Sequence, residues 1–139
     1  MIAYFDTSAL VKLFLRDEEG ASTAAAVWDA SDIKFACRIA YPEGRAALGA
    51  AHRSGRLTTG ALARAREELS SLFDELAVIE LHAQLARQAG DVSEWFGLRA
   101  IDAIHLASAI VISDAPMVLV TWDEQLARAG LLAGLDVAP

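Results

Sequence analysis

The chain has 139 residues, enough for one domain with a single core, and its 55% hydrophobic content excludes a disordered protein. Its net charge of −7 opposes nucleic-acid binding by overall charge, because a surplus of carboxylates repels phosphate groups. The single cysteine, Cys37, excludes an internal disulfide and a cysteine-rich zinc site, and a reducing environment is expected.

Hydrophobic periodicity predicts strands and helices that alternate along the chain. In the first half we expect a strand at 2–5, a helix from about Ala9 capped by Asp6, Thr7 or Ser8, a helix at 22–30, a strand at 33–37, and a helix at 39–52 with Pro42 in its first turn. In the second half we expect a helix from Thr58 or Thr59 to about 76, a strand at 77–81, helices at 82–95 and 98–110, a strand at 117–120, a helix at 124–129 stopped by Gly130, and an edge strand at 135–137.

The predicted strands are apolar runs, and helices separate most of them. This order indicates an α/β fold in three layers: a central, mostly parallel sheet with helices on both faces, forming one domain over residues 1–139. Sheets of this kind bind ligands beyond the carboxyl ends of their strands. Asp6 and Asp123 each follow a predicted strand directly, so both are expected at that edge.

No segment is typical of export or of membrane insertion. Neither a basic lead nor a long apolar stretch precedes Asp6. The longest nearly uncharged run, 106–116, is too short to span a bilayer. We therefore expect a soluble, cytoplasmic protein that does not bind membranes.

Asp102 is the acid that the sequence singles out most clearly, because the predicted helix around it is apolar almost all round. An ionised group there is costly unless it is compensated or opens into a cavity. Arg99 and His105, at helical spacing, are alternative partners. Asp6 and Asp123 could equally serve as helix caps. Carboxylates gathered in one pocket need a cation, and Mg²⁺ or Mn²⁺ prefers oxygen ligands.

Three segments carry a resemblance to a known family: Tyr-Phe-Asp-Thr-Ser-Ala-Leu-Val-Lys at 4–12, Leu-Arg-Ala-Ile-Asp-Ala-Ile-His-Leu-Ala at 98–107, and Val-Thr-Trp-Asp-Glu-Gln-Leu at 120–126. Their order and spacing resemble the PIN-domain family, and most of all its VapC-type toxin ribonucleases. The resemblance implies that the metal-binding, catalytic acids are Asp6, Glu43, Asp102 and Asp123. It also implies that Thr7, Ser8 and Thr121 are small polar residues near the site.

The segment before Glu43 departs from the family pattern. Many relatives have serine or threonine a few residues before this glutamate, whereas this chain reads Arg-Ile-Ala-Tyr-Pro at 38–42. The continuation after Glu43 matches the family. Considered alone, a glutamate in the first turn of a helix is explained by the helix dipole. The assignment of Glu43 therefore depends on the resemblance.

The resemblance implies an endoribonuclease that depends on Mg²⁺ or Mn²⁺. It further implies the toxin of a type II toxin–antitoxin system, with a small antitoxin partner and a homodimeric assembly. RNA contacts are expected from the arginine-rich segment 34–66, which holds seven of the twelve basic residues and only one acid. Arg38, Arg45 and Arg53 are the candidates. The alternative is that this segment is a solvated pair of helices.

The sequence also leaves other functions open. His105, one turn after Asp102, is a candidate general acid or, in the preferred interpretation, a partner in the hydrogen bonding of its helix. A PIN-like domain kept only for protein interaction would bind no metal. A receiver-type phosphoacceptor domain needs a lysine after a late strand, but the only lysines are Lys12 and Lys34. An aspartate-nucleophile phosphatase needs a second aspartate at position 8, which is serine.

Overall fold

Five strands form one parallel sheet at the centre of the computed structural model, which describes residues 1–139. The strands are β1 (Ile2–Phe5), β2 (Ile33–Cys37), β3 (Ala77–Ile79), β4 (Met117–Val120) and β5 (Asp136–Ala138), in the order β3-β2-β1-β4-β5. All neighbouring pairs run parallel. The sheet order therefore reverses direction at β1, and β4 lies directly beside it.

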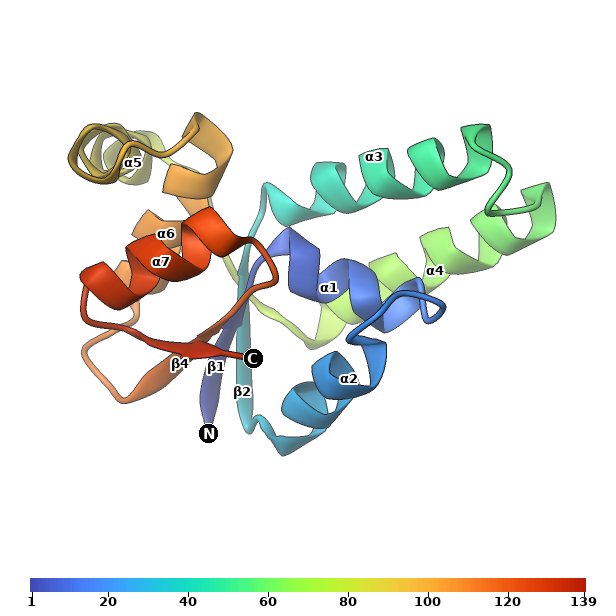
Figure 1. Cartoon of the computed structure of the whole chain (residues 1–139), viewed down its shortest axis with the longest axis horizontal. Coiled ribbons are helices and arrows are strands. Elements are labelled where there is room, and N and C mark those ends of the chain that lie inside the picture. Colours follow the sequence, from blue (N-terminus) through green and yellow to red (C-terminus); the bar gives the residue numbers. More distant parts are fainter.

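Seven helices cover the two faces of the sheet (Figure 1). They are α1 (Thr7–Phe14), α2 (Ala21–Ala30), α3 (Ala40–Arg53), α4 (Thr59–Glu75), α5 (Ala83–Phe96), α6 (Ala100–Val111) and α7 (Glu124–Leu132). Helices α1 to α4 pack on one face, and α5 to α7 pack on the other. This arrangement confirms the predicted three-layer α/β fold.

Strand β1 shows why its residues are apolar on both sides. Ala3 and Phe5 point into the core beneath α1, α3 and α4, whereas Tyr4 points into the core beneath α5, α6 and α7. All three side chains are fully buried. Because side chains alternate across a strand, a central strand covered on both faces must be apolar at every position. Tyr4 is the one β1 residue that brings a polar group into this interior.

The predicted end of the last helix at Gly130 is wrong. Helix α7 continues to Leu132, and Gly130 is buried within it. A Cβ atom at Gly130 would lie 2.7 Å from Leu119 Cδ2, so the absent side chain lets the helix approach the sheet. The chain turns instead at Gly134, whose φ of 84° is readily adopted only by glycine. Gly130 therefore allows α7 to pack closely against the sheet and does not end the helix.

The other predicted elements are present with small shifts at their ends. Strands 2–5, 33–37 and 117–120 have the predicted bounds, and α1 begins two residues earlier than expected because Asp6 caps it. The strand predicted at 77–81 ends at Ile79. No helix in the chain is both long enough and apolar enough to cross a membrane.

Candidate active site

Asp6 lies where β1 ends and α1 begins, and it is only 4% exposed. Its Oδ1 accepts the N-cap hydrogen bond from the Ala9 backbone N–H at 2.9 Å. Ser8 Oγ lies 2.7 and 2.9 Å from its two carboxylate oxygens, and Thr121 Oγ1 donates to Oδ2 at 2.8 Å. Burial raises the pKa of Asp6, and the lowering influence of His105 and of these donors does not offset it.

The two hydroxyl groups beside Asp6 also join the ends of β1 and β4. Thr121 Oγ1 accepts from the Asp123 backbone N–H at 3.0 Å, and Ser8 Oγ accepts from the Trp122 N–H at 2.8 Å. Each hydroxyl therefore donates to Asp6 and accepts from the segment that follows β4. This double use fixes the relative position of two strand ends that are far apart in the sequence.

Asp102 and Asp123 share one cation, Arg99. Asp102 is in the first turn of α6 and is 8% exposed; its Oδ2 accepts from Arg99 Nε at 3.2 Å. Arg99 Nη2 lies 3.9 Å from Asp123 Oδ2, while Asp123 Oδ1 caps α7 by accepting from the Leu126 N–H at 2.8 Å. The Arg99 side chain is 78% exposed, so these ion pairs are weak. Asp123 therefore caps α7 and also lies near another of the acids.

Glu43 lies in the first turn of α3 and bonds to groups from two other elements. Its Oε1 accepts from Thr7 Oγ1 at 2.7 Å and lies 2.7 Å from His105 Nε2. Partial burial tends to raise the pKa of Glu43, but the hydrogen bond from His105 above all, together with the bond from Thr7, lowers it overall. The other nitrogen of His105, Nδ1, lies 2.8 Å from the hydroxyl of Tyr4.

All four predicted acids therefore belong to one connected set of residues at the carboxyl edge of the sheet. Thr7 follows Asp6 in the chain and bonds Glu43, Thr121 joins Asp6 to Asp123, and Arg99 joins Asp123 to Asp102. This edge, between β1 and β4, is where the strand order reverses. Ligands bind at such points in open α/β sheets.

The donor chemistry of the four acids fits a hard divalent cation, which takes carboxylate oxygens and retains several waters. As placed here, no three of these side chains already form a group able to hold one ion. Asp6, Asp102 and Asp123 are carboxylates that could hold a metal directly. Glu43, with Oε1 engaged by two donors, would bind through Oε2 or through water.

Comparison with known proteins gives the family. A model of the PIN domain matches residues 3–132. The chain is 42% identical over 138 residues to ribonuclease VapC45 of Mycobacterium tuberculosis strain CDC 1551 / Oshkosh, which covers 99% of this chain and 95% of that protein. The same values hold for ribonuclease VapC49 of strain H37Rv. The chain belongs to the PIN-domain family. The VapC-type resemblance of its three motif segments is thereby confirmed.

Solved structures show that the fold is shared at low sequence identity. The M. tuberculosis toxin VapC20, described as cleaving the sarcin-ricin loop, matches with a TM-score of 0.68 at 19% identity over 92% of this chain and 95% of its own. FitAcB of Neisseria gonorrhoeae matches with a TM-score of 0.71 at 19% identity over 100% and 97%. A toxin–antitoxin complex of Klebsiella pneumoniae matches with a TM-score of 0.63 at 20% identity over 87% and 86%.

The arginines suggested for RNA contact lie at different places in this PIN domain. Arg38 forms an exposed ion pair with Glu80. Arg45 is one turn from Tyr41, with its guanidinium 5.9 Å from the tyrosine ring centre and its Nη1 3.2 Å from the hydroxyl. Arg53 ends α3, about 15 Å along the helix axis from Glu43 at 1.5 Å per residue. Along α3, Arg53 is therefore much farther from Glu43 than Arg45 is.

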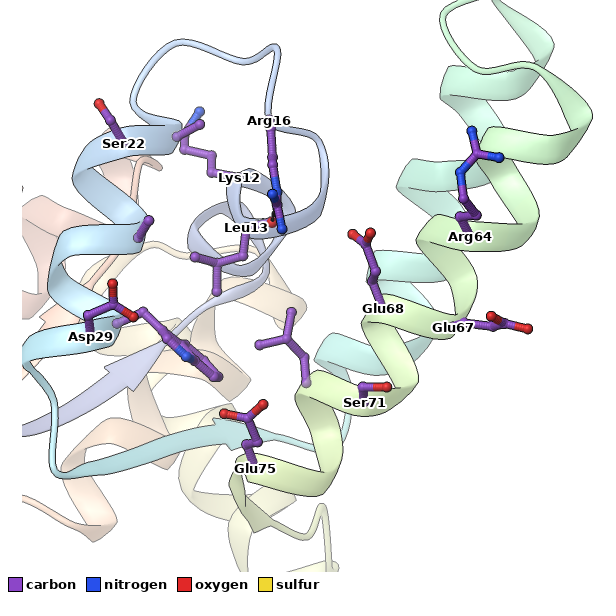
Figure 2. A pocket seen from close by; sticks show the side chains of 14 residues that line it. Lys12, Leu13, Arg16, Ser22, Asp29, Arg64, Glu67, Glu68, Ser71 and Glu75 are labelled. Carbon is purple, nitrogen blue, oxygen red and sulfur yellow. Dashed lines mark hydrogen bonds between the residues drawn. The ribbon is translucent and has the colours of Figure 1, made fainter.

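One hollow of the PIN domain is separate from the acids. It is a groove of about 850 Å³ between α1 and α2 on one side and α4 on the other (Figure 2). Leu13 is at its base, and Arg16 of the α1 end and Glu68 of α4 flank it. None of the four acids lines this groove. The groove and the acidic edge are therefore two separate places on the domain.

Sequence reasoning missed Tyr4 as part of the site region. It precedes Asp6 by two residues and was assigned only to a strand. The available signal was the phenol itself, because a tyrosine in a strand buried on both faces needs a hydrogen-bond partner. The identity of that partner, His105, is 101 positions away in the sequence and was not readable from it.

Proposed function

We propose that this protein is a metal-dependent endoribonuclease and the toxin of a toxin–antitoxin pair. The observation that carries the proposal is the connected set of four carboxylates at the edge where β1 and β4 meet. Its support from outside the chain is the 42% identity to two ribonucleases over nearly the full length. The receiver-type and phosphatase alternatives fall with membership of the PIN family.

In the proposed reaction, hydrolysis cleaves an RNA phosphodiester bond. A bound Mg²⁺ or Mn²⁺ would supply a water of lowered pKa and would neutralise charge on the phosphate. Asp6, Asp102 and Asp123 would hold the ion, and Ser8 and Thr121 keep Asp6 in place. A carboxylate that is not fully engaged, such as Glu43 through Oε2, can accept the proton of the attacking water.

Substrate binding is proposed to use the basic surface near α3. Arg38 lies just before the helix that carries Glu43, Arg45 lies in its early turns and Arg53 is its last residue; all three are exposed. Such contacts neutralise backbone phosphates and carry no sequence information. The proposal therefore names RNA as the substrate class without a cleavage sequence.

The partner is proposed to be a small antitoxin, as in the toxin–antitoxin complex of K. pneumoniae that shares this fold. The groove between α1, α2 and α4 offers such a partner an apolar base at Leu13, Trp28 and Leu72, with charges of both signs at its rim. A short reading frame beside the gene, whose product copurifies with this chain, is the expected result. A homodimer is part of the same proposal, and its test is the mass of the purified chain in solution.

The proposed enzyme is tested with total bacterial RNA as the probe. Wild-type protein should produce new RNA ends with Mn²⁺ or Mg²⁺. Cleavage should stop when EDTA is added and should resume when excess Mn²⁺ is restored. Asp102→Asn should lower cleavage by more than about 100-fold, because altering even a partner of a metal ligand commonly costs 10- to 100-fold. Sequencing of the ends would name the target.

A matched control separates chemistry from charge. Asp114→Asn also removes one carboxylate, but Asp114 is exposed and lies beyond the end of α6. The Asp114→Asn variant should therefore cleave RNA like the wild type. Undiminished cleavage by a folded Asp102→Asn would overturn the proposed active site. A wild-type chain that shows no heat of Mn²⁺ binding and no cleavage would instead support the alternative of an interaction module.

A further inference from the structure

His105 is a buried ionisable side chain beside the candidate site, at 2% exposure. It lies on α6, one turn after Asp102, yet it bonds to neither Asp102 nor Arg99. Its Nε2 is 2.7 Å from Glu43 Oε1 and its Nδ1 is 2.8 Å from Tyr4 Oη. Both ring nitrogens are therefore occupied, one by an acid of the site and one by a buried phenol from β1.

The partners determine where the proton of the imidazole lies. An ionised Glu43 only accepts hydrogen bonds, so Nε2 carries the hydrogen. In a neutral ring with its hydrogen on Nε2, Nδ1 can only accept, so the Tyr4 hydroxyl, 2.8 Å away, is the donor. The connected donors run from Tyr4 to His105 to Glu43. With these donors and acceptors, the side chains of Tyr4, His105 and Glu43 make both hydrogen bonds in a single arrangement.

We propose that Tyr4 and His105 position Glu43 for the reaction, by fixing one carboxylate oxygen and leaving the other to the reacting centre. Oε1 receives both Thr7 and His105, whereas Oε2 makes no hydrogen bond within the chain. Partners of this kind orient the acids around metals and affect activity nearly as much as the ligands do. The inference rests on the proposed nuclease function and assigns a role within it that the acids alone do not have.

The same geometry argues against His105 as a general acid. A general acid must reach the leaving oxygen of the substrate, but the ring of His105 is enclosed and both its nitrogens are engaged. His105 is accordingly a positioning residue. A merely structural role is the remaining alternative, and it predicts that stability changes while the properties of Glu43 do not.

The first test measures the hydrogen bonds that join Tyr4, His105 and Glu43, and it does not depend on RNA cleavage. Long-range ¹⁵N NMR of the wild-type chain should show the Nε2–H tautomer of His105. Tyr4→Phe, which removes only the hydroxyl, should keep this tautomer, because Glu43 still accepts from Nε2, but should shift the Nδ1 resonance, because Nδ1 loses its hydrogen-bond donor. An Nδ1–H tautomer in the wild type, or a spectrum unchanged in Tyr4→Phe, would overturn the inference. This readout stays informative if the protein proves not to cleave RNA.

The second test is a double-mutant cycle in RNA cleavage with Mn²⁺. His105→Ala and Glu43→Gln should each lower kcat by about 10- to 100-fold with KM little changed, and the double variant should be no worse than the more impaired single variant. Effects that multiply would show that His105 does not act through Glu43 and would overturn the inference. Since His105→Ala risks poor folding, His105→Gln, which keeps an amide donor near the position of Nε2, should recover most of the loss.

A stability control completes the design. Leu106→Ala removes a fully buried side chain from the same helix and leaves every hydrogen bond of Glu43 and Tyr4 in place, so it should lower the unfolding temperature while kcat stays within about twofold of the wild type below that temperature. Loss of kcat in Leu106→Ala equal to that in His105→Ala would attribute the effect to destabilisation and would overturn the positioning role. If the wild type itself neither cleaves RNA nor binds Mn²⁺, the proposed function fails. The NMR result alone then decides whether Tyr4, His105 and Glu43 are joined by these hydrogen bonds.

Discussion

Two carboxylates at the same edge of the sheet, Asp6 and Glu43, are held in contrasting ways. Asp6 is enclosed at a strand end by two hydroxyl groups and a backbone N–H. Glu43 projects from a helix and bonds to a hydroxyl and an imidazole. Burial raises the pKa of Asp6, whereas the pKa of Glu43 is lowered because His105 and Thr7 outweigh its partial burial.

The difference shows that uncharged hydrogen-bond donors can orient a buried carboxylate without fully offsetting the cost of burying its charge. Three donors leave the Asp6 carboxylate less favourable as an anion than it is in water, and no lysine or arginine pairs with it. A divalent cation beside Asp6 would supply the missing compensation. Glu43 already has a partner, so it gains less from a cation. Asp6 is accordingly expected to be the stronger metal ligand of the two.

The largest expected effect is on cleavage. Asp6→Asn should lower RNA cleavage with Mn²⁺ by more than about 100-fold, and Glu43→Gln by about 10- to 100-fold, because only the first removes an acid that is proposed to bind the metal directly. Calorimetry should show weaker Mn²⁺ binding in Asp6→Asn than in Glu43→Gln. A larger loss of Mn²⁺ affinity in Glu43→Gln would reverse the comparison and make Glu43 the principal ligand.

An intermediate effect is expected on stability when the hydroxyl groups are removed. Thr121→Val keeps the shape but leaves Asp6 Oδ2 and the Asp123 N–H without their buried partner, at a cost of about 1–3 kcal/mol in the free energy of unfolding. Thr7→Val, at a partly buried bond, should cost about 0.5–1.5 kcal/mol. Urea unfolding measures both, with the exposed Thr23→Val on α2 as control. Equal values for Thr121 and Thr7 would contradict the stronger enclosure of Asp6.

The smallest expected effect is an opposite dependence of stability on pH. Because the pKa of Asp6 is raised in the folded chain, the wild type gains stability relative to Asp6→Asn as pH falls from neutrality through that raised pKa toward the ordinary value of 3.8. Because the pKa of Glu43 is lowered, the stability that Glu43 contributes is complete above the ordinary value of 4.5 and is lost as pH falls through the lowered pKa.

Thermal unfolding of the two variants and the wild type between neutral and acid pH, in metal-free buffer, measures these slopes. Differences of opposite sign are expected for Asp6→Asn and Glu43→Gln. Slopes of the same sign would mean that the two acids share one environment, and the contrast between hydroxyl and imidazole partners would then not hold.

Part of the candidate site was predictable because it depends on local patterns. Apolar runs placed β1 and β4, and the residue after each is an acid that caps the next helix, as Asp6 and Asp123 do. Asp102 stood out because its helix is otherwise apolar, and Arg99 was readable as a neighbour at helical spacing. Glu43 was found through the family resemblance, since a first-turn glutamate has a sufficient local explanation.

The sequence by itself determined the order and approximate bounds of the strands and helices, because hydrophobic period and capping are local properties of the chain. Only the tertiary structure decided that β1 lies between β2 and β4, which places Asp6 beside Thr121. It also decided that Gly130 serves packing, and that His105 joins Tyr4 to Glu43. These contacts link residues 62 to 115 positions apart, and period and capping do not encode which distant side chains meet.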